Sequence, residues 1–412
     1  MSRPELYQLL QAYLKTHQPF HLDLLKQMVA INSFTANSAG VNALGRLTAS
    51  AFAELGFTAK TVQSTNLMFG RHVILTRPGR TARKIGLVSH LDTVFPHDEE
   101  VRNNFVWREA GDKIYGPGTV DIKGGTVVIY MILAALQAIT PETYDDITWV
   151  VLLNASEEEL LDDFGQLCRQ ELAGDTLACL VFEGGHQVGG DWTVVVSRKG
   201  RATYHVTVEG KGAHAGSSHQ EGANAIVQLA KTIQQVAELT DYARDLTFNV
   251  GAAAGGTVMN RVPHYASAAV EMRAFAPDVF EAGMKSMMAL GQQSSVRNAV
   301  GDYACQIDIE LLEQTAPWAR NEGSDYLLSI WQEAAAALGQ RVSPEARGGL
   351  SDGNWTWQHM PTIDGLGPYG GNSHCSEESA DGRKQQEYVL ASSLVPKALL
   401  NTLAILKLIE KH

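Results

Sequence analysis

Three adjacent carboxylates, Glu157, Glu158 and Glu159, follow directly on the apolar run ITWVVLLN. Carboxylates this close together repel one another, so the arrangement costs free energy unless a cation lies beside them. The run before them has the composition of a buried strand, which places the carboxylates at its carboxyl end. A cation bound there needs further ligands from other parts of the chain.

Two more apolar runs end in polar residues of the same kind. The run KIGLVSH ends at His90, with Asp92 two residues later, and LACLVFEGG contains Glu183. A histidine at a strand end is usually a structural residue, but a metal-bound imidazole commonly donates its other N–H to a carboxylate such as Asp92. In open parallel sheets, ligands bind beyond the carboxyl ends of the strands. We therefore take His90 and the strand-end glutamates as candidate metal ligands, and Asp92 as the partner of His90.

The glycine-rich segment YGPGTVDIKGG precedes a helix-length apolar run. A dinucleotide-binding loop is disfavoured because Asp121 stands where a third glycine is expected and would repel a pyrophosphate, and the spacing to Lys123 does not fit a P-loop. Two interpretations remain open. The segment is either a plain flexible turn or a sharp turn whose glycines let the backbone hold Asp121 toward a cation.

A second histidine, His374, lies in the glycine-rich loop DGLGPYGGNSH. A histidine in a loop is normally solvated, but a metal site at the strand ends needs a second nitrogen ligand besides His90. Imidazole and carboxylate ligands without thiolates are typical of zinc or a similar divalent ion in a catalytic site. Two dications with three carboxylate ligands keep one positive charge, which suits the activation of a water molecule.

The adjacent glutamates then divide their roles. Glu158 is a candidate ligand, together with Asp121 and Glu183. Glu157 is not needed as a ligand and is the candidate general base, which takes the proton of the water and delivers it to a leaving amine. We expect Glu159 to lie on the surface.

The elements that must position these residues are predicted from hydrophobic periodicity. Apolar runs alternating with helices predict an α/β fold with a mostly parallel sheet that is flanked by helices on both faces. The predicted strands span 72–76, 84–90, 147–154 and 177–185, and the predicted helices span 21–31, 41–57 and 124–139. The alternating pattern resumes from about residue 316.

The pattern changes near residue 198, where RATYHVTVEG alternates like a half-exposed antiparallel strand. From there the order is strand, helix, two strands, helix, strand, which predicts an α+β open sandwich of the ferredoxin-like kind. We place this inserted domain at 199–315. The catalytic domain then comprises 1–198 and 316–412.

Composition limits the partners and the compartment. Lys and Arg number 33 against 45 Asp and Glu, and the net charge of -12 makes nucleic acid or an anionic membrane an unlikely partner. The N-terminal residues lack the features of a signal peptide, and no later run looks apolar for long enough to span a bilayer. We therefore expect a cytoplasmic protein. The four scattered cysteines are expected to be reduced thiols.

Nine motifs, read in order, resemble the M20 metallopeptidases, a family that includes glutamate carboxypeptidase, acetylornithine deacetylase, succinyl-diaminopimelate desuccinylase and aminoacylase. The resemblance covers nearly the whole chain beyond the first helix. The motifs are SHLDTV, GPGTVDIKGG, NASEEE, FEGG, GKGAHAGSSHQEGANAI, GGTVMNRVP, EMR, GGLSDGN and DGLGPYGGNSH. Three positions depart from the family pattern: Ser156 stands where an aspartate is common, Leu160 where many members carry glycine, and SSH follows GAHAG where a proline is common.

The resemblance implies a role for each candidate. Asp121 would bridge two metal ions, Asp92 would orient an imidazole, and Glu157 would be the general base. The implied metal ligands are His90, Asp121, Glu158, Glu183 and His374.

For the inserted domain, the resemblance implies a lid that is also the interface of a homodimer. His214 would reach the active site of the partner subunit and stabilise the oxyanion. Asn260 and Arg273 would contact the substrate, with Arg273 binding its carboxylate through bidentate hydrogen bonds. Without the resemblance, His214 reads as a surface histidine and Arg273 as an exposed charge at a sheet edge.

The expected activity is hydrolysis of a peptide or amide bond next to a free carboxylate, with two divalent ions as cofactors. Zinc is the first expectation, and cobalt and manganese are the alternatives. We expect a glutamate-carboxypeptidase-like exopeptidase acting on a small peptide, and an N-acyl-amino-acid deacylase is the alternative. A non-catalytic dimeric binding protein of the same fold would lack a ligand or the base, and none is missing. A nucleotide-binding enzyme would depend on GPGTVDIKGG alone.

Overall fold

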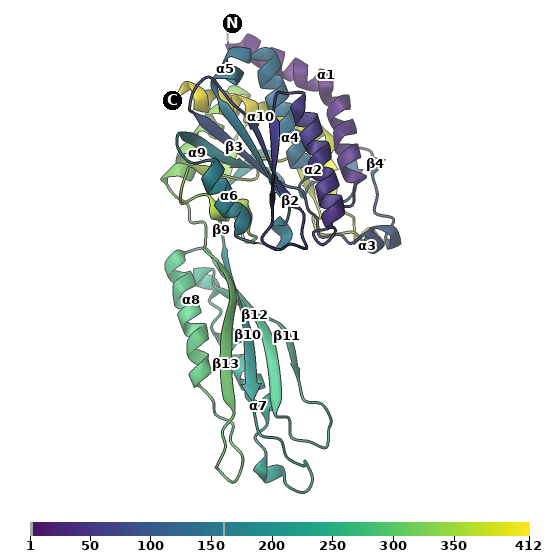
Figure 1. Cartoon of the computed structure of the whole chain (residues 1–412). Coiled ribbons are helices and arrows are strands. Elements are labelled where there is room, and N and C mark those ends of the chain that lie inside the picture. Colours follow the sequence, from purple (N-terminus) through teal and green to yellow (C-terminus); the bar gives the residue numbers. More distant parts are fainter. Residues whose placement is uncertain (1–2, 160) are drawn as a thin grey trace. The chain divides into compact units, whose positions relative to one another are not determined.

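The computed structural model describes residues 3–159 and 161–412 and divides into two compact units (Figure 1). The first unit comprises Met1–Val196, Arg320–Ala346 and Ser351–His412, and the second comprises Ser197–Ala319 and Arg347–Leu350. The short segment 347–350 lies outside the predicted inserted domain. It groups with the second unit because Arg198 donates hydrogen bonds to the carbonyl oxygens of Gly349 and Leu350. Leu160 lies outside the described residues.

The first unit is built on a six-stranded sheet with the order β1-β2-β6-β3-β7-β15. Its strands are β1 (Thr58–Gln63), β2 (Arg71–Arg77), β3 (Lys84–His90), β6 (Thr148–Asn154), β7 (Thr176–Val181) and β15 (Thr362–Ile363). The neighbours from β6 to β15 pair in parallel, as predicted, whereas β2 pairs antiparallel with β6. The sheet is therefore mostly parallel, as predicted. The strand predicted at 72–76 is its antiparallel member next to β6, since the connection 78–83 is too short for a parallel crossover, which needs a dozen or more residues.

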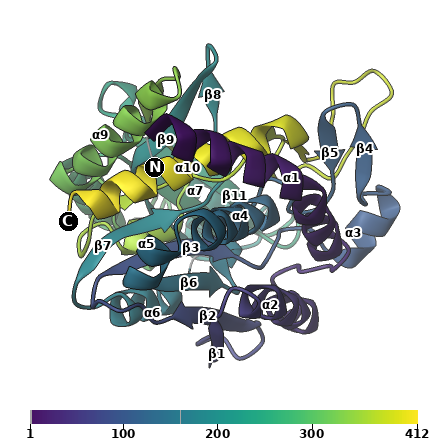
Figure 2. The same ribbon diagram turned by 90° about the horizontal axis from the view of Figure 1, so that it is seen from above.

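Helices cover both faces of this sheet, as predicted, and Figure 2 shows α1, α4 and α10 stacked on one side. Alternate strand residues face opposite layers: Leu87 and Val151 pack in the core with these helices, whereas Val88 and Leu152 pack against α6. The helices of the first layer are α1 (Arg3–Val29), α2 (Ser38–Ala53), α4 (Lys123–Ile139), α9 (Glu322–Ala337) and α10 (Ala391–Glu410), and α6 is Asp163–Glu171.

Helix α10 is long and apolar enough to cross a membrane by length and composition, so the expectation that no run is long enough was wrong for this helix. In the structure α10 packs against α4, α9 and α1, and most of its apolar window is buried. A buried position of this kind is typical of the core helix of a folded domain.

Several elements escaped the sequence analysis; some are strands of two or three residues, which are too short to show a periodicity, and others have six to eight residues. One small sheet has the order β16-β17-β5-β4. It consists of β16 (Gly370–Gly371), β17 (Tyr388–Leu390), β5 (Lys113–Tyr115) and β4 (Arg108–Ala110). A second has the order β14 (Val342–Arg347), β9 (Asp191–Arg198) and β8 (Gln187–Val188), and the short helices are α3 (His97–Arg102) and α5 (Pro141–Asp146).

The second unit contains a four-stranded antiparallel sheet with the order β11-β12-β10-β13. Its elements occur in the predicted order: β10 (Gly200–Glu209), α7 (Ala225–Glu238), β11 (Thr247–Gly255), β12 (Tyr265–Ala274), α8 (Pro277–Ala289) and β13 (Gln306–Thr315). Along β10, Tyr204, Val206 and Val208 are buried and alternate with half-exposed residues, so one face of the sheet forms this unit's own core. All four cysteines of the chain are free thiols, as expected.

Candidate metal centre

Three neighbouring parallel strands of the first unit end side by side, and each presents a candidate residue. Strand β3 ends at His90, which is in register with Asn154 at the end of β6, and Val88 is in register with Val181 at the end of β7. The short helix η1 (Glu157–Glu159) follows β6, and Glu183 follows β7 by two residues. The parallel register therefore brings His90 and the strand-end glutamates to one edge of the sheet.

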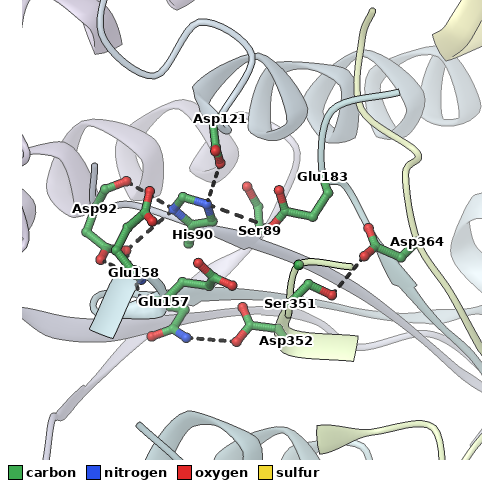
Figure 3. Close-up of polar contacts among 12 residues, drawn as sticks. Ser89, His90, Asp92, Asp121, Glu157, Glu158, Glu183, Ser351, Asp352 and Asp364 are labelled. Atoms are coloured by element: carbon green, nitrogen blue, oxygen red, sulfur yellow. Dashed lines mark hydrogen bonds and ion pairs between the residues drawn. The ribbon is translucent and has the colours of Figure 1, made fainter. Parts of the chain in front are cut away.

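Asp121 lies between the two candidate imidazoles. Its Oδ1 is 3.1 Å from His90 Nε2, and its Oδ2 is 3.2 Å from His374 Nε2. Figure 3 shows Asp121 and Glu183 beside the ring of His90, and the Oε1 of Glu183 lies 3.8 Å from the same Nε2. On the other side, His374 Nε2 lies 3.3 Å from Glu158 Oε2.

These contacts define two groups of possible ligand atoms that share one carboxylate. Within each group all atoms lie within 4.8 Å of one another; the groups are His90, Asp121 and Glu183, and Asp121, Glu158 and His374. Nitrogen and oxygen donors without thiolates fit zinc and similar divalent ions in catalytic sites. A carboxylate that offers one oxygen to each group fits a bridging ligand. The residues present therefore fit a pair of divalent ions.

The small sheet β16-β17-β5-β4 brings Asp121 and His374 together, although they are far apart in the sequence. Asp121 lies in the loop that follows β5, and His374 lies in the loop between β16 and β17. Because β5 and β17 pair directly, both loops leave the same small sheet. His374 adopts a left-handed backbone conformation with φ of 65°, which is uncommon for a residue with a side chain.

The carboxylates of the site favour the protonated form of both imidazoles when no metal is bound. Burial opposes protonation of His90, but hydrogen bonds with Asp121 and Asp92 raise its pKa well above the ordinary value. Hydrogen bonds with Asp121 and Glu158 raise the pKa of His374 to about 10. Burial works against ionisation of Asp121, yet its contacts with the two histidines hold its pKa below the ordinary range. Divalent ions bound by the same atoms would displace these protons.

Glu157 belongs to neither of the two groups that share Asp121, although it forms a third group with His90 and Glu158, whose ligand atoms also lie within 4.8 Å of one another. It is buried, whereas its neighbour Glu159 is exposed, as predicted. Burial raises the pKa of Glu157 well above its usual value; the nearby Glu183 and Glu158 add to the shift, and His90 opposes it. A buried carboxylate beside the ligand groups is placed to exchange a proton with a water molecule held there.

Asp92 fixes both His90 and the segment that carries the glutamates. Its backbone oxygen accepts a hydrogen bond from His90 Nδ1 at 3.0 Å, and its carboxylate Oδ1 lies 3.4 Å from the same nitrogen. The carboxylate also accepts hydrogen bonds from the backbone N–H groups of Glu157 and Glu158 and from the hydroxyl of Thr35. With Nδ1 donating to Asp92, Nε2 of His90 is free to bind a metal ion.

Sequence reasoning missed a second layer of supporting residues. The Asn154 side chain donates to Asp352 at 2.8 Å and accepts from the backbone N–H of Ser156 at 3.0 Å. Burial raises the pKa of Asp352 to about 7. His72 Nδ1 accepts from the backbone N–H of Ala155, two residues before the candidate base. The motif GGLSDGN contains Asp352 and was the only available signal; nothing in the sequence marks His72.

The candidate residues of the second unit do not form one cluster. His214 and Asn260 are close, because the backbone N–H of Ala215 donates to the oxygen of Asn260. Their sequence neighbours Ala215, Met259 and Arg261 are among the residues that line a cavity of about 480 Å³. The sequence analysis did not single out Arg261, which lines this cavity.

Arg273 lies at the opposite end of β12 from the loop that contains Asn260. The rise of a strand places Arg273 roughly 26 Å from Tyr265, where β12 begins. Its Nε and Nη2 donate to the carboxylate of Glu271, and Nη1 donates to the backbone oxygen of Gly348. Since a guanidinium has five N–H donors, two remain for another acceptor.

Comparisons with known proteins agree with the motifs. The sequence model of Peptidase family M20/M25/M40 matches residues 86–400. Carboxypeptidase G2 of Pseudomonas sp. (strain RS-16) is 29% identical over 363 residues, which cover 87% of this chain and 83% of that protein. Acetylornithine deacetylase of Erwinia tasmaniensis is 26% identical over 267 residues, which cover 60% of this chain and 66% of that protein.

Among solved structures, a tripeptidase from Staphylococcus aureus has the same fold, with a TM-score of 0.75 at 21% identity over 96% of this chain and 99% of that one. At this identity the likeness concerns the fold alone. The family match extends over three quarters of the chain and includes the segments that carry all five candidate ligands. The chain belongs to Peptidase family M20/M25/M40, as its motifs predicted.

Proposed function

We propose that this protein is a metal-dependent exopeptidase that removes the C-terminal residue of a small peptide. The observation that carries the proposal is the position of Asp121, whose two oxygens face the imidazoles of His90 and His374 within two groups of ligand atoms. Its similarity to carboxypeptidase G2 supports cleavage next to a free carboxylate. The cofactors would be two divalent ions, with zinc first and cobalt or manganese as alternatives for the same donors.

Divalent ions held by His90, Asp121, Glu158, Glu183 and His374 would supply the Lewis acidity that polarises a water molecule and the scissile carbonyl group. Glu157 accepts a proton from the water molecule while the oxygen of that water attacks the carbonyl carbon. Glu157 then donates that proton to the nitrogen of the leaving amine as the C–N bond breaks. Asp92 holds His90 through Nδ1 and fixes the backbone of Glu157, so neither side chain must reorganise during the reaction.

We propose that Arg273 binds the substrate carboxylate with its two remaining N–H donors, and that Asn260 and His214 contact the substrate as well. In one copy of the chain, the strand rise separates Arg273 from the start of β12 by roughly 26 Å. An extended dipeptide spans only about 7 Å. Contact of one small substrate with both Arg273 and His214 therefore requires a second copy of the chain.

A homodimer formed through the second unit would supply that copy. Strand β11 is at the edge of its sheet, and its residues 251–255 are exposed. The strand TFNVGAAAG contains no charged residue, although charges and prolines are the usual protection of an exposed edge. An unprotected edge of this kind fits pairing with a second copy. In this arrangement the second unit would be both the dimer interface and a lid.

The second candidate function is the hydrolysis of N-acyl amino acids, which the similarity to acetylornithine deacetylase favours. Both reactions need the same ligands and the same base, so the metal centre does not distinguish them. The two substrates differ in the acyl group on the carbonyl side of the scissile bond: it is an amino-acid or peptide residue in the first reaction and a simple acyl group in the second.

The test is to measure the metal content of the purified protein and its rates of hydrolysis on a panel of dipeptides and N-acetyl amino acids. We expect two equivalents of divalent metal per chain, hydrolysis of dipeptides with a varied C-terminal residue, and weaker hydrolysis of N-acetyl amino acids. Removing the metal with a chelator should abolish both, and adding zinc should restore them. A faster reaction with N-acetyl amino acids would favour the deacylase, and a protein that binds no divalent metal would refute both functions.

A further inference from the structure

We infer that Glu387 is a positioning residue for the metal centre: its buried carboxylate and its backbone hold the loop carrying Asp121 and the loop carrying His374 together. The inference rests on the proposed function, since it concerns how the two-metal site is assembled. Glu387 is not among the ligands or the base named above.

The side chain of Glu387 holds the Asp121 loop directly. Its Oε1 accepts hydrogen bonds from the backbone N–H of Val120 at 2.9 Å and of Asp121 at 3.2 Å, and the hydroxyl of Thr119 lies 3.5 Å away. A carboxylate that accepts hydrogen bonds from two successive backbone N–H groups fixes the orientation of the peptide unit between them. The direction in which Asp121 leaves the backbone therefore depends on Glu387.

The backbone of Glu387 holds the other loop. Its N–H donates to the oxygen of Cys375 at 2.8 Å, one residue beyond His374, and its own oxygen lies 3.4 Å from the backbone N–H of Gly116. The next residue, Tyr388, pairs with Tyr115 in the small sheet. One residue thus links the loop 116–121 to the loop 372–387 through both its side chain and its backbone.

Both loops need such support. His374 and Asn372 have positive φ of 65° and 60°, conformations that persist in side-chain-bearing residues only when the surroundings fix them. Glu387 is completely buried, and its second oxygen, Oε2, has no hydrogen-bond partner among the described residues. A buried carboxylate with an unsatisfied oxygen destabilises a fold, and this cost is typical of a residue kept for function.

Zinc titration of metal-free protein tests the inference. In Glu387→Ala the two backbone N–H groups lose their acceptor, and we expect both zinc-binding steps to weaken by about 10- to 100-fold, the range typical of residues that support metal ligands. In Glu387→Gln the amide oxygen can still accept both hydrogen bonds, so we expect affinities within about three-fold of the wild type. The affinities are measured by competition with a chromogenic chelator.

Tyr144→Phe is the matched control for general destabilisation. Its buried hydroxyl donates to the oxygen of Leu55, and removing it disturbs the same unit without touching either loop. We expect this variant to lower the unfolding midpoint and to keep both zinc affinities. Circular dichroism and thermal unfolding then identify which variants remain folded at the titration temperature. If Glu387→Ala does not fold, the comparison of Glu387→Gln with Glu387→Asp, whose shorter side chain cannot reach both N–H groups, takes its place.

Wild-type affinities for both zinc ions in folded Glu387→Ala, or in Glu387→Asp where the alanine variant is unfolded, would overturn the role of Glu387 and leave the proposed function intact. An equal loss in Glu387→Gln would also overturn it, because the amide keeps the acceptor. A wild-type protein that binds no zinc, cobalt or manganese would instead refute the proposed function.

Discussion

The two units of the chain carry their candidate residues in different ways. In the first unit, residues from distant parts of the sequence meet at one edge of a mostly parallel sheet. Backbone N–H groups around them donate hydrogen bonds to the side chains of Asp92 and Asn154, which fixes this backbone. In the second unit, His214 and Arg273 lie at opposite ends of an antiparallel sheet. The first unit contains all the candidate ligands and the candidate base, whereas the second contains only candidate substrate-contact residues.

The direction of the strands determines whether one unit can form a small, compact site by itself. Neighbouring parallel strands end together, so their loops can surround one small site. Antiparallel strands end alternately at opposite edges, so residues at the two ends of one strand serve different surfaces. We therefore expect substitutions in the first unit to affect the chemical step, and substitutions in the second unit to affect substrate binding or assembly.

The largest expected effect is that of Glu157→Ala. Loss of the general base should lower kcat by about 10²- to 10⁴-fold, while the metal content stays at the wild-type value because both groups that share Asp121 keep all their ligand atoms. The matched control is Glu159→Ala, which changes an exposed neighbour in the same short helix and should leave kcat unchanged. Ordinary activity in the Glu157 variant would remove the base from the mechanism.

The second effect concerns substrate binding in the second unit. Arg273→Gln should raise KM about 10- to 100-fold for peptides with a free C-terminal carboxylate, since hydrogen bonds to charged groups contribute about 1.5–3 kcal/mol. The KM for the corresponding carboxamides should change little. Arg201→Gln is the control, because Arg201 pairs with the same Glu271 from strand β10. Equal effects in the two variants would show that Arg273 acts only through the stability of the second unit.

Much of the first unit was predictable because its signals are local. The runs ending at His90 and Asn154 have the composition of buried strands, and the rule for parallel sheets then places their following residues together. The antiparallel direction of β2 was not predicted, although the short connection 78–83 before β3 already limited it. The residues that hold the site, such as Glu387, were missed because their contacts depend on strands of two or three residues.

In the second unit the elements were predictable from the sequence, but the roles of the candidate residues were not. Its elements were predicted closely, since β10 and β12 alternate along their whole length. Yet the substrate roles of Asn260 and Arg273 came from the family resemblance and not from the pattern of residues. An exposed side chain on a strand or loop has the same sequence signal whether it binds a substrate or only water. The proposed substrate roles of Asn260 and Arg273 depend on a second copy of the chain, whose position no single-chain sequence pattern encodes.

A smaller effect, on the free energy of unfolding, is expected from substitution of Asp163, which contacts His72 near the end of β6. His72 Nε2 lies 3.3 Å from Asp163 Oδ2, and the same carboxylate accepts from Ser64 and Thr65. Burial opposes ionisation of Asp163, but these hydrogen bonds hold its pKa below the ordinary value. Asp163→Asn should lower the free energy of unfolding at pH 7 by about 1–3 kcal/mol.

The pH dependence gives the sign of this contribution. Because the pKa of Asp163 is lower in the folded state, its ionised form stabilises the protein above the unfolded-state pKa of about 4. The stabilisation is lost as the pH falls from about 4 toward the lower folded-state value, so the wild type and the variant should converge in acid. Asp162→Asn is the control and should change the free energy by less than about 0.5 kcal/mol, because Asp162 is a partly exposed surface residue. A difference that is constant with pH would contradict the role of the charge.

The smallest effect on the stability of the fold, and the sharpest test of assembly, is Ala253→Lys on the exposed edge strand β11. A lysine on a sheet edge opposes pairing with another strand, so the variant should sediment as a monomer where the wild type sediments as a dimer. Its free energy of unfolding should change by less than about 0.5 kcal/mol. Ala336→Lys, at an exposed position of α9 in the first unit, should remain dimeric. If the monomeric variant kept full activity on dipeptides, His214 would have no role in the partner's site, and the first unit would be sufficient for both binding and chemistry.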